Sequence, residues 1–267
     1  MIFQKMLDGN KIPIIGTGTN TYGKVNQEYT GDINHDTTEL DSAIRLGYQL
    51  FDTAISYRNE SVVGRALSDQ REKYFITTKL PMREGYFETE STILNHVKSS
   101  LDNLQTDYID LYLIHKPHME DEVNLRVYKS LLNAKDKGLI KSVGVSNFSQ
   151  SQLEYLMDHE SSWPVLNQIE INPKNYPKDL IRFCLKHKII PQAWSPLGNM
   201  DQSMKNLLSM IGKNYGKTWA QVWLKFLIMQ GINIIPKSHN PQNQMLNLDL
   251  FDFDLTETEK SLIVAKL

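Results

Sequence analysis

The feature that most constrains the fold is an alternation of short apolar runs with segments of helical periodicity, repeated eight times along the chain. Runs of this length that alternate with helices are typical of parallel strands in βαβ units. Eight such units over roughly 250 residues predict a (β/α)8 TIM barrel, and an open doubly wound sheet is the alternative. The predicted strands are Ile14–Gly18, Gln49–Asp52, Tyr74–Lys79, Ile109–His115, Lys141–Ser146, Leu166–Glu170, Ile189–Trp194 and Ile232–Lys237.

The segments between these runs carry helix signals. Apolar residues spaced four, four and three apart share one helical face, as at Ile93, Val97, Leu101 and Leu104. Capping boxes, which mark helix starts, are predicted at Ser149 with Gln152, Thr218 with Gln221, and Thr256 with Glu259. Glycines that end a helix before a strand are predicted at Gly47, Gly138 and Gly231.

The first fifteen residues predict an additional β-hairpin. Its strands would be Phe3–Leu7 and Lys11–Ile15, joined by the turn Asp8-Gly9-Asn10, and it would close the bottom of the barrel. No linker, low-complexity segment or shift of composition interrupts the chain, so we expect residues 1–267 to form a single domain.

Composition excludes several classes of protein. A single cysteine, Cys184, rules out an intrachain disulfide and a cysteine-based metal cluster. The formal charge of −2, without a basic block, argues against a nucleic-acid partner. No apolar stretch is long enough to span a membrane, and the first residues do not look like a signal peptide. We therefore expect a cytoplasmic protein, monomeric, with no metal and no disulfide-linked partner.

Polar side chains collect where the predicted strands end. In a parallel barrel these carboxyl ends form one face, which is where active sites are built. Each such residue alone is more often a helix cap or a solvated side chain, but their convergence on one ring indicates a functional site. The residues are Thr19 and Asn20, Asp52, Lys79, His115, Ser146 and Asn147, Gln168 and Glu170, Trp194 and Ser195, and Lys237 and Ser238.

Four residues of this face form a chemically sensible set. Tyr57 follows Asp52 by five residues, so the intervening loop can return its phenol over the barrel mouth. A phenol with a pKa of about 10 is a poor acid near neutrality unless a cation stabilises its phenolate. Lys79 could be that cation, held by Asp52, and His115 could hydrogen bond at the same centre. A tyrosine proton donor of this kind suits carbonyl reduction, in which negative charge develops on oxygen.

A series of short motifs runs in order almost from end to end of the chain. They are Gly16-Thr17-Gly18-Thr19, Phe51-Asp52-Thr53-Ala54 with Tyr57-Arg58-Asn59-Glu60, Thr78-Lys79, Asp110-Leu111-Tyr112-Leu113-Ile114-His115, Gly144-Val145-Ser146-Asn147-Phe148, Asn167-Gln168-Ile169-Glu170, Trp194-Ser195-Pro196-Leu197-Gly198 and Ile235-Pro236-Lys237-Ser238. In this series the sequence resembles the aldo-keto reductase family, in particular its prokaryotic reductases of small aldehydes and keto-sugars.

The resemblance implies an NADP-dependent oxidoreductase that reduces aldehydes or ketones to alcohols. Its catalytic tetrad would be Asp52, Tyr57, Lys79 and His115. Tyr57 would act as general acid, Lys79 would lower its pKa, Asp52 would hold Lys79, and His115 would orient the carbonyl. The expected cofactor is NADPH, with NADH possible.

Further positions match cofactor contacts of the family. Trp194 stands at the position, usually tyrosine, that stacks on the nicotinamide ring. Ser146, Asn147 and Gln168 match residues that contact the carboxamide, and Ser195 and Leu197 match residues near the pyrophosphate. Lys237 and Ser238 match residues that face the 2′-phosphate, and Asn247 matches an adenine contact. Thr19, Asn20 and Asp52 are expected to line the cofactor as well.

Three positions depart from the family pattern. Asn243 stands where an arginine often pairs with the 2′-phosphate, which predicts only a modest preference for NADPH. Asn20 replaces an aromatic residue and Lys116 replaces a common tryptophan. Together with Tyr57 and His115, these two are expected to contact substrate and to favour small polar carbonyl compounds.

Two other functions fit part of the pattern. A lysine at the end of a barrel strand can attack a carbonyl, so a Schiff-base aldolase using Lys79 is one alternative. A non-catalytic, cofactor-binding redox sensor is the other, although a sensor has no evident need for all four tetrad residues.

Overall fold

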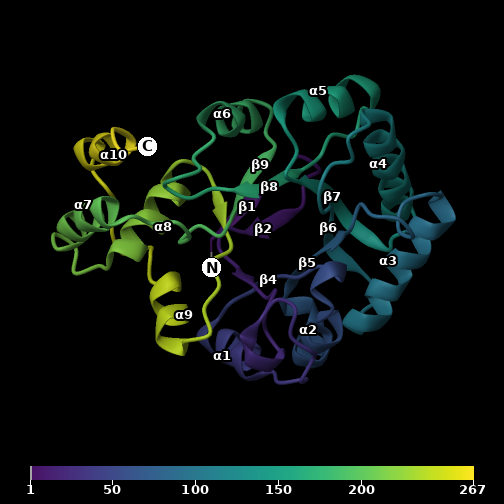
Figure 1. Ribbon diagram of the computed structural model, residues 1–267, viewed down its shortest axis with the longest axis horizontal. Helices are drawn as coiled ribbons and strands as arrows, with labels where there is room; N and C mark the ends of the chain where they lie inside the picture. Colours follow the sequence, from purple (N-terminus) through teal and green to yellow (C-terminus); the bar gives the residue numbers. More distant parts are fainter. Residues whose placement is uncertain (1) are drawn as a thin grey trace.

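The centre of the computed structural model, which describes residues 2–267, is a parallel sheet of eight strands (Figure 1). Each strand from β3 to β10 pairs with the next, and a parallel bridge between Ile15 and Ile234 joins the two ends. The sheet therefore forms a nearly closed barrel, as predicted. The alternative prediction of an open doubly wound sheet is wrong. The strands are β3 (Thr17–Gly18), β4 (Leu50–Asp52), β5 (Phe75–Leu80), β6 (Ile109–Ile114), β7 (Ile140–Ser146), β8 (Leu166–Glu170), β9 (Ile190–Trp194) and β10 (Asn233–Ile234).

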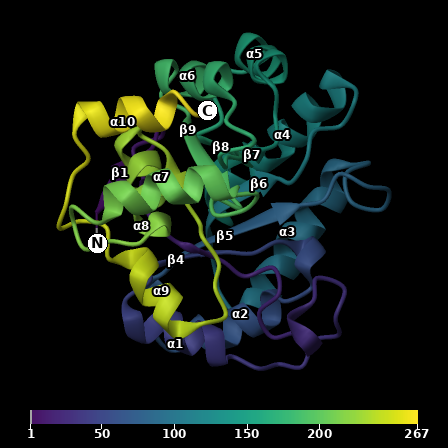
Figure 2. The ribbon, with the colours of Figure 1, turned by 60° about the vertical axis from the view of Figure 1, so that its left-hand side comes forward.

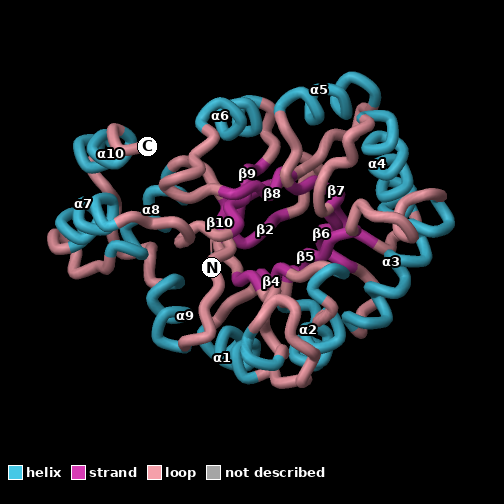
Figure 3. Tube along the Cα trace, in the orientation of Figure 1, coloured by secondary structure: helices cyan, strands magenta, loops and turns pink. Residues whose placement is uncertain are grey.

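Helices surround the strands (Figure 3). Seen from a second direction, the helix nearest the carboxyl terminus, α10, lies beside α7 (Figure 2). None of the helices in residues 2–267 has the length and apolar character to cross a bilayer. Their bounds are α1 (Thr38–Leu46), α2 (Glu60–Leu67), α3 (Glu90–Leu104), α4 (Asp121–Asp136), α5 (Gln150–His159), α6 (Lys178–Lys186), α7 (Gln202–Gly212), α8 (Trp219–Met229), α9 (Pro241–Leu248) and α10 (Glu257–Val264).

The local signals that define these helices are present. The predicted apolar face of α3 is buried against the barrel. The three predicted capping boxes begin α5, α8 and α10, with both reciprocal hydrogen bonds formed in each. Gly47, Gly138 and Gly231 have φ values of 94°, 76° and 80°. Glycine adopts this left-handed conformation at little cost, so the chain can turn from helix to strand at these points.

The two strands at the closure are shorter than predicted. The sequence predicted Ile14–Gly18 and Ile232–Lys237, but β3 keeps only Thr17–Gly18 and β10 only Asn233–Ile234. Pro236 has no N–H to donate to a ladder, which limits the carboxyl end of β10.

The predicted hairpin is present, with shorter strands than predicted. β1 (Phe3–Lys5) pairs antiparallel with β2 (Lys11–Pro13). Its turn is fastened near the amino end of β7, where Ser142 Oγ donates to Asp8 Oδ2 at 2.8 Å. The hairpin therefore lies at the end of the barrel opposite the carboxyl ends of the strands.

The interior of the barrel is built in layers. Alternate residues of a strand point to the same side. One apolar cluster joins the hairpin region to the barrel strands, and its members are Met6, Ile12, Leu50, Leu111, Leu113, Val165, Leu166, Ile190 and Ile235. Asp52 and Gln168, which line the cavity described below, each lie two residues after a member of this cluster. The same alternation therefore places polar side chains above an apolar floor.

Candidate active site

A cavity of about 950 Å³ opens at the carboxyl ends of the strands. It is the place predicted for an active site in a parallel barrel. Most of the predicted site residues line it, namely Thr19, Asn20, Asp52, Tyr57, His115, Lys116, Ser146, Asn147, Gln168, Trp194, Ser195, Leu197 and Lys237.

The turn after β4 brings Tyr57 over this cavity. The 3-10 helix η2 (Ile55–Tyr57) ends at Arg58, whose φ of 62° reverses the chain. Asn59 is fully buried, and its Nδ2 donates to the Thr19 carbonyl at 2.7 Å. This hydrogen bond ties the turn to the loop after β3, so the position of the phenol is fixed by two neighbouring loops.

A buried ion pair lies beneath Tyr57. Lys79 Nζ is 2.6 Å from Asp52 Oδ1 and donates to the Thr53 carbonyl at 2.8 Å. The same nitrogen is 3.4 Å from the Tyr57 hydroxyl oxygen. Lys79 is fully buried, so its ammonium has no water to solvate it and is held by these three oxygens.

The pKa shifts of this group define its charge state. Burial lowers the pKa of Lys79, but the charge of Asp52 and the hydrogen bonds to Asp52 and Tyr57 raise it more, so Lys79 stays protonated. Burial raises the pKa of Tyr57, and the charge of Lys79 opposes that shift without cancelling it. The expected lowering by Lys79 is thus present, but the net direction is upward because burial is the larger effect. Tyr57 therefore carries its proton at neutral pH.

His115 follows β6 directly, and its ring centroid is 5.6 Å from that of Tyr57. Burial, followed by the charges of Lys79 and Lys116, lowers the pKa of His115 to about 3. Its imidazole is neutral near pH 7, with one N–H donor and one acceptor nitrogen.

One wall of the cavity is a chain of hydrogen bonds around Asn147. Trp194 Nε1 donates to Asn147 Oδ1 at 3.0 Å, which fixes the indole plane. Asn147 Nδ2 donates to the His115 carbonyl at 3.1 Å and to Ser146 Oγ at 3.0 Å. Ser146 Oγ in turn donates to the Gln168 carbonyl at 2.8 Å. These bonds hold the aromatic and amide side chains in a single arrangement.

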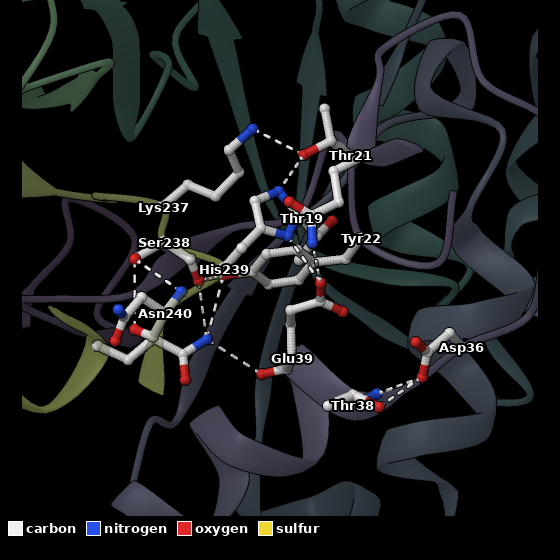
Figure 4. A network of polar contacts seen from close by, with 12 residues as sticks. Thr19, Thr21, Tyr22, Asp36, Thr38, Glu39, Lys237, Ser238, His239 and Asn240 are labelled. Carbon is white, nitrogen blue, oxygen red and sulfur yellow. Dashed lines mark hydrogen bonds and ion pairs between the residues drawn. The ribbon is translucent and has the colours of Figure 1, made fainter. Parts of the chain in front are cut away.

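Lys237 brings a positive charge to the cavity lining, and Figure 4 shows its contact with Thr21. Lys237 Nζ donates to Asn20 Oδ1 and Thr21 Oγ1, both at 2.8 Å. Thr21 also contacts His239 Nε2 at 2.8 Å, and His239 Nδ1 lies 2.7 Å from Glu39 Oε1. Within residues 2–267 Lys237 forms no ion pair, so its charge is available to an anion.

Five predicted residues lie outside the cavity lining, and one of them, Glu170, accepts a hydrogen bond from Asn172 Nδ2 at 2.9 Å. Lys79 is beneath it, in contact with Asp52 and Tyr57. Ser238 Oγ donates to the Asn240 carbonyl at 3.3 Å. Asn243 is exposed on the first turn of α9, and Asn247 is buried beside Tyr48.

Sequence analysis missed Tyr29, which also lines the cavity. Its ring centroid is 5.9 Å from that of Tyr57, in an edge-to-face arrangement. Tyr29 lies in an irregular loop between β3 and α1, where no periodic pattern indicates which side chain turns inward. As for metals, no cluster of three or more His, Cys, Asp or Glu residues within positions 2–267 is arranged to bind an ion.

Comparisons with known proteins show the family to which this chain belongs. The model of the aldo/keto reductase family matches residues 14–267. A methylglyoxal reductase, DkgA, of Escherichia coli O157:H7 is 36% identical over 98% of this chain and 92% of its own length. A D-galacturonate reductase of Fragaria ananassa is 35% identical over 94% of this chain and 86% of its own.

Solved structures are similar over the whole fold. An aldo/keto reductase from Brucella melitensis superposes with a TM-score of 0.89 at 34% identity, covering 100% of this chain and 99% of the other. A Bombyx mori aldo-keto reductase in complex with NADP superposes with a TM-score of 0.88 at 32% identity, covering 99% of this chain and 92% of the other. The chain belongs to the aldo/keto reductase family. It is therefore an oxidoreductase.

The low pKa of His115 predicts a pH dependence of stability. The folded state keeps this imidazole neutral down to about pH 3, whereas the unfolded chain protonates it near pH 6.5. The unfolded state therefore binds more protons between these values, and the free energy of unfolding falls by up to about 1.4 kcal/mol per pH unit as pH drops through the window. Urea unfolding at pH 7.5 and at pH 5 measures this change. The free energy of unfolding should decrease less between the two pH values in His115→Gln than in the native protein. Equal losses would mean that His115 is solvated enough to titrate normally.

Proposed function

We propose that this protein reduces aldehydes and ketones to alcohols at the cavity, with NADPH as hydride donor and Tyr57 as general acid. The observation that carries the proposal is the position of Lys79 Nζ between Asp52, at 2.6 Å, and the Tyr57 hydroxyl, at 3.4 Å. A protonated phenol beside a permanently charged ammonium can release its proton to a developing alkoxide, because the cation stabilises the phenolate that remains.

The residues present fit a nicotinamide cofactor. Trp194 offers a flat ring fixed by its bond to Asn147, and Gln168 offers a carboxamide at the cavity wall. At the other end Lys237 offers an ammonium that neutral oxygens hold in place, as a phosphate site requires. Bound reduced nicotinamide supplies the hydride.

The protein side chains then manage charge on the carbonyl oxygen. Neutral His115 donates an N–H to that oxygen and orients it. Tyr57 donates its proton to the same oxygen, and Lys79 stabilises the phenolate. Burial raises the pKa of Asp52, whereas the charge of Lys79 and the hydrogen bonds accepted from Lys79 at Oδ1 and from Gln168 at Oδ2 oppose that shift and favour its carboxylate.

The proposed substrates are small polar carbonyl compounds. Asn20 and Lys116 line the cavity at positions where an aromatic wall would bind large arenes. Lys116 is exposed and would attract carboxylates or hydroxyl-rich substrates. The names of two relatives give methylglyoxal and D-galacturonate as their substrates, which are compounds of this kind.

The burial of Lys79 argues against the aldolase alternative. A Schiff-base lysine must reach the substrate as a neutral amine. Lys79 is fully buried, protonated and beneath the cavity lining. The redox-sensor alternative predicts cofactor binding without turnover of any aldehyde, so the assay below also decides between it and the enzyme.

Replacing Tyr57 tests the proton donor. Tyr57→Phe removes only the hydroxyl, and general acids contribute about 10²–10⁴-fold, so we expect kcat for methylglyoxal to fall by at least that factor. NADPH affinity, measured by quenching of tryptophan fluorescence, should be nearly unchanged. A variant that keeps a tenth of its kcat would assign the proton to another residue.

Adding a cation on α9 tests cofactor selectivity. Asn243→Arg should place a guanidinium near the 2′-phosphate, and a charge-assisted hydrogen bond of roughly 1.5–3 kcal/mol would raise NADPH affinity about ten-fold or more, with NADH unchanged. Gln242→Arg is the matched control, since it adds the same charge at the next exposed position of the same turn. Equal gains in both variants would show a general electrostatic effect and no contact by residue 243.

A further inference from the structure

A row of buried amide side chains crosses the barrel interior from the cavity to the N-terminal hairpin. Gln168 Nε2 donates to Gln192 Oε1 at 2.7 Å, and Gln192 Nε2 donates to Asn233 Oδ1 at 2.8 Å. Asn233 Nδ2 donates to the Pro13 carbonyl at 2.8 Å and to Gln4 Oε1 at 2.9 Å. Gln168, Gln192 and Asn233 are each at most 2% exposed. Barrel interiors are usually filled with branched apolar residues, so this row is unusual.

Each end of the row is fixed by a group that can only accept hydrogen bonds. At the bottom, the Pro13 carbonyl requires Asn233 to present its NH2, which leaves Asn233 Oδ1 as the acceptor for Gln192. At the top, the second oxygen of Asp52 accepts from Gln168 Nε2 at 2.7 Å. The two ends impose the same orientation on every amide between them. None of the three amide groups can rotate by 180° without placing an NH2 against an NH2 or an oxygen against an oxygen.

The direction of the row decides what Gln168 offers to the cavity. Its Nε2 donates to both Asp52 and Gln192. Its Oε1 accepts no hydrogen bond from residues 2–267, and Gln168 lines the cavity. The free group is therefore an acceptor, which suits the NH2 of a carboxamide.

We propose that Gln192 and Asn233 are positioning residues for the cofactor carboxamide: they hold Gln168 with its NH2 inward and its oxygen in the cavity. This inference rests on the proposed function and deepens it. Neither residue reaches the cavity lining, so both act through Gln168, and through Gln168 on the second oxygen of Asp52.

The test compares two ligands that differ in one group. NADP carries a carboxamide NH2, while its 3-acetylpyridine analogue carries a methyl ketone and cannot donate. Binding of each is measured by quenching of tryptophan fluorescence, without turnover. We expect the native protein to prefer NADP. Gln192→Met, of similar length but unable to hydrogen bond, should lose about ten-fold in NADP affinity, the worth of a good hydrogen bond, with little change for the analogue.

Thr77→Val is the matched control. Thr77 is also fully buried in the barrel, on β5, and its Oγ1 has no hydrogen-bond partner, so isosteric replacement removes no bond of the row. Its preference for NADP should equal that of the native protein. A purely structural effect of Gln192→Met would weaken both ligands by the same factor, and that result would overturn the inference.

A second variant gives a pH-dependent readout that a loss of packing would not produce. In Gln192→Glu the protonated carboxyl can still donate to Asn233 and accept from Gln168, but the carboxylate cannot donate. The preference for NADP over the analogue should therefore be near native at pH 5 and reduced at pH 8, while Thr77→Val shows no such change. A preference that does not depend on pH in this variant would contradict the inference. A native protein that binds neither ligand would instead refute the proposed function.

Discussion

The ion pair between Lys79 and Asp52 is the interaction on which the rest of the site depends. Two opposite charges 2.6 Å apart, shielded from water, are costly to bury unless each is fully paired. Here the remaining donors and acceptors are also used: Lys79 donates to the Thr53 carbonyl, and Asp52 accepts from Gln168. The pair thereby fixes a permanent positive charge 3.4 Å from the Tyr57 hydroxyl oxygen.

The barrel makes this arrangement possible through the alternation of its strands. Leu50, Leu111, Leu113 and Leu166 belong to a buried apolar layer inside the sheet. The next inward position of β4 is Asp52, and that of β8 is Gln168. Beneath them Gln192 and Asn233 replace part of the apolar filling by an amide row that ends on the hairpin. The hairpin thus contributes an anchor for the site from the opposite end of the barrel.

Much of this could be predicted from the sequence because the signals are local. Apolar runs with helices between them define the barrel, and a polar residue after each run defines its functional face. The tetrad residues are within reach of one another because neighbouring strands end at the same edge, so sequence order is enough to place Asp52 and Lys79 together.

Other features depend on packing between distant segments and have no local signal. Tyr29 lies in an irregular loop, and the hairpin partners of Asn233, Gln4 and Pro13, are 229 and 220 residues away along the chain. The net upward shift of the Tyr57 pKa could not be predicted either, because it depends on burial, and the motif shows only the neighbouring cation.

The most direct test of the central claim, that Lys79 acts through the Tyr57 proton, is a double-mutant cycle measured on kcat with saturating NADPH. Lys79→Met and Tyr57→Phe are compared singly and together, with thermal unfolding to establish that each variant is folded. The account predicts that the double variant is about as slow as the slower single variant, because residues that act as one unit are not additive. A double variant whose loss equals the product of the two single losses would contradict it.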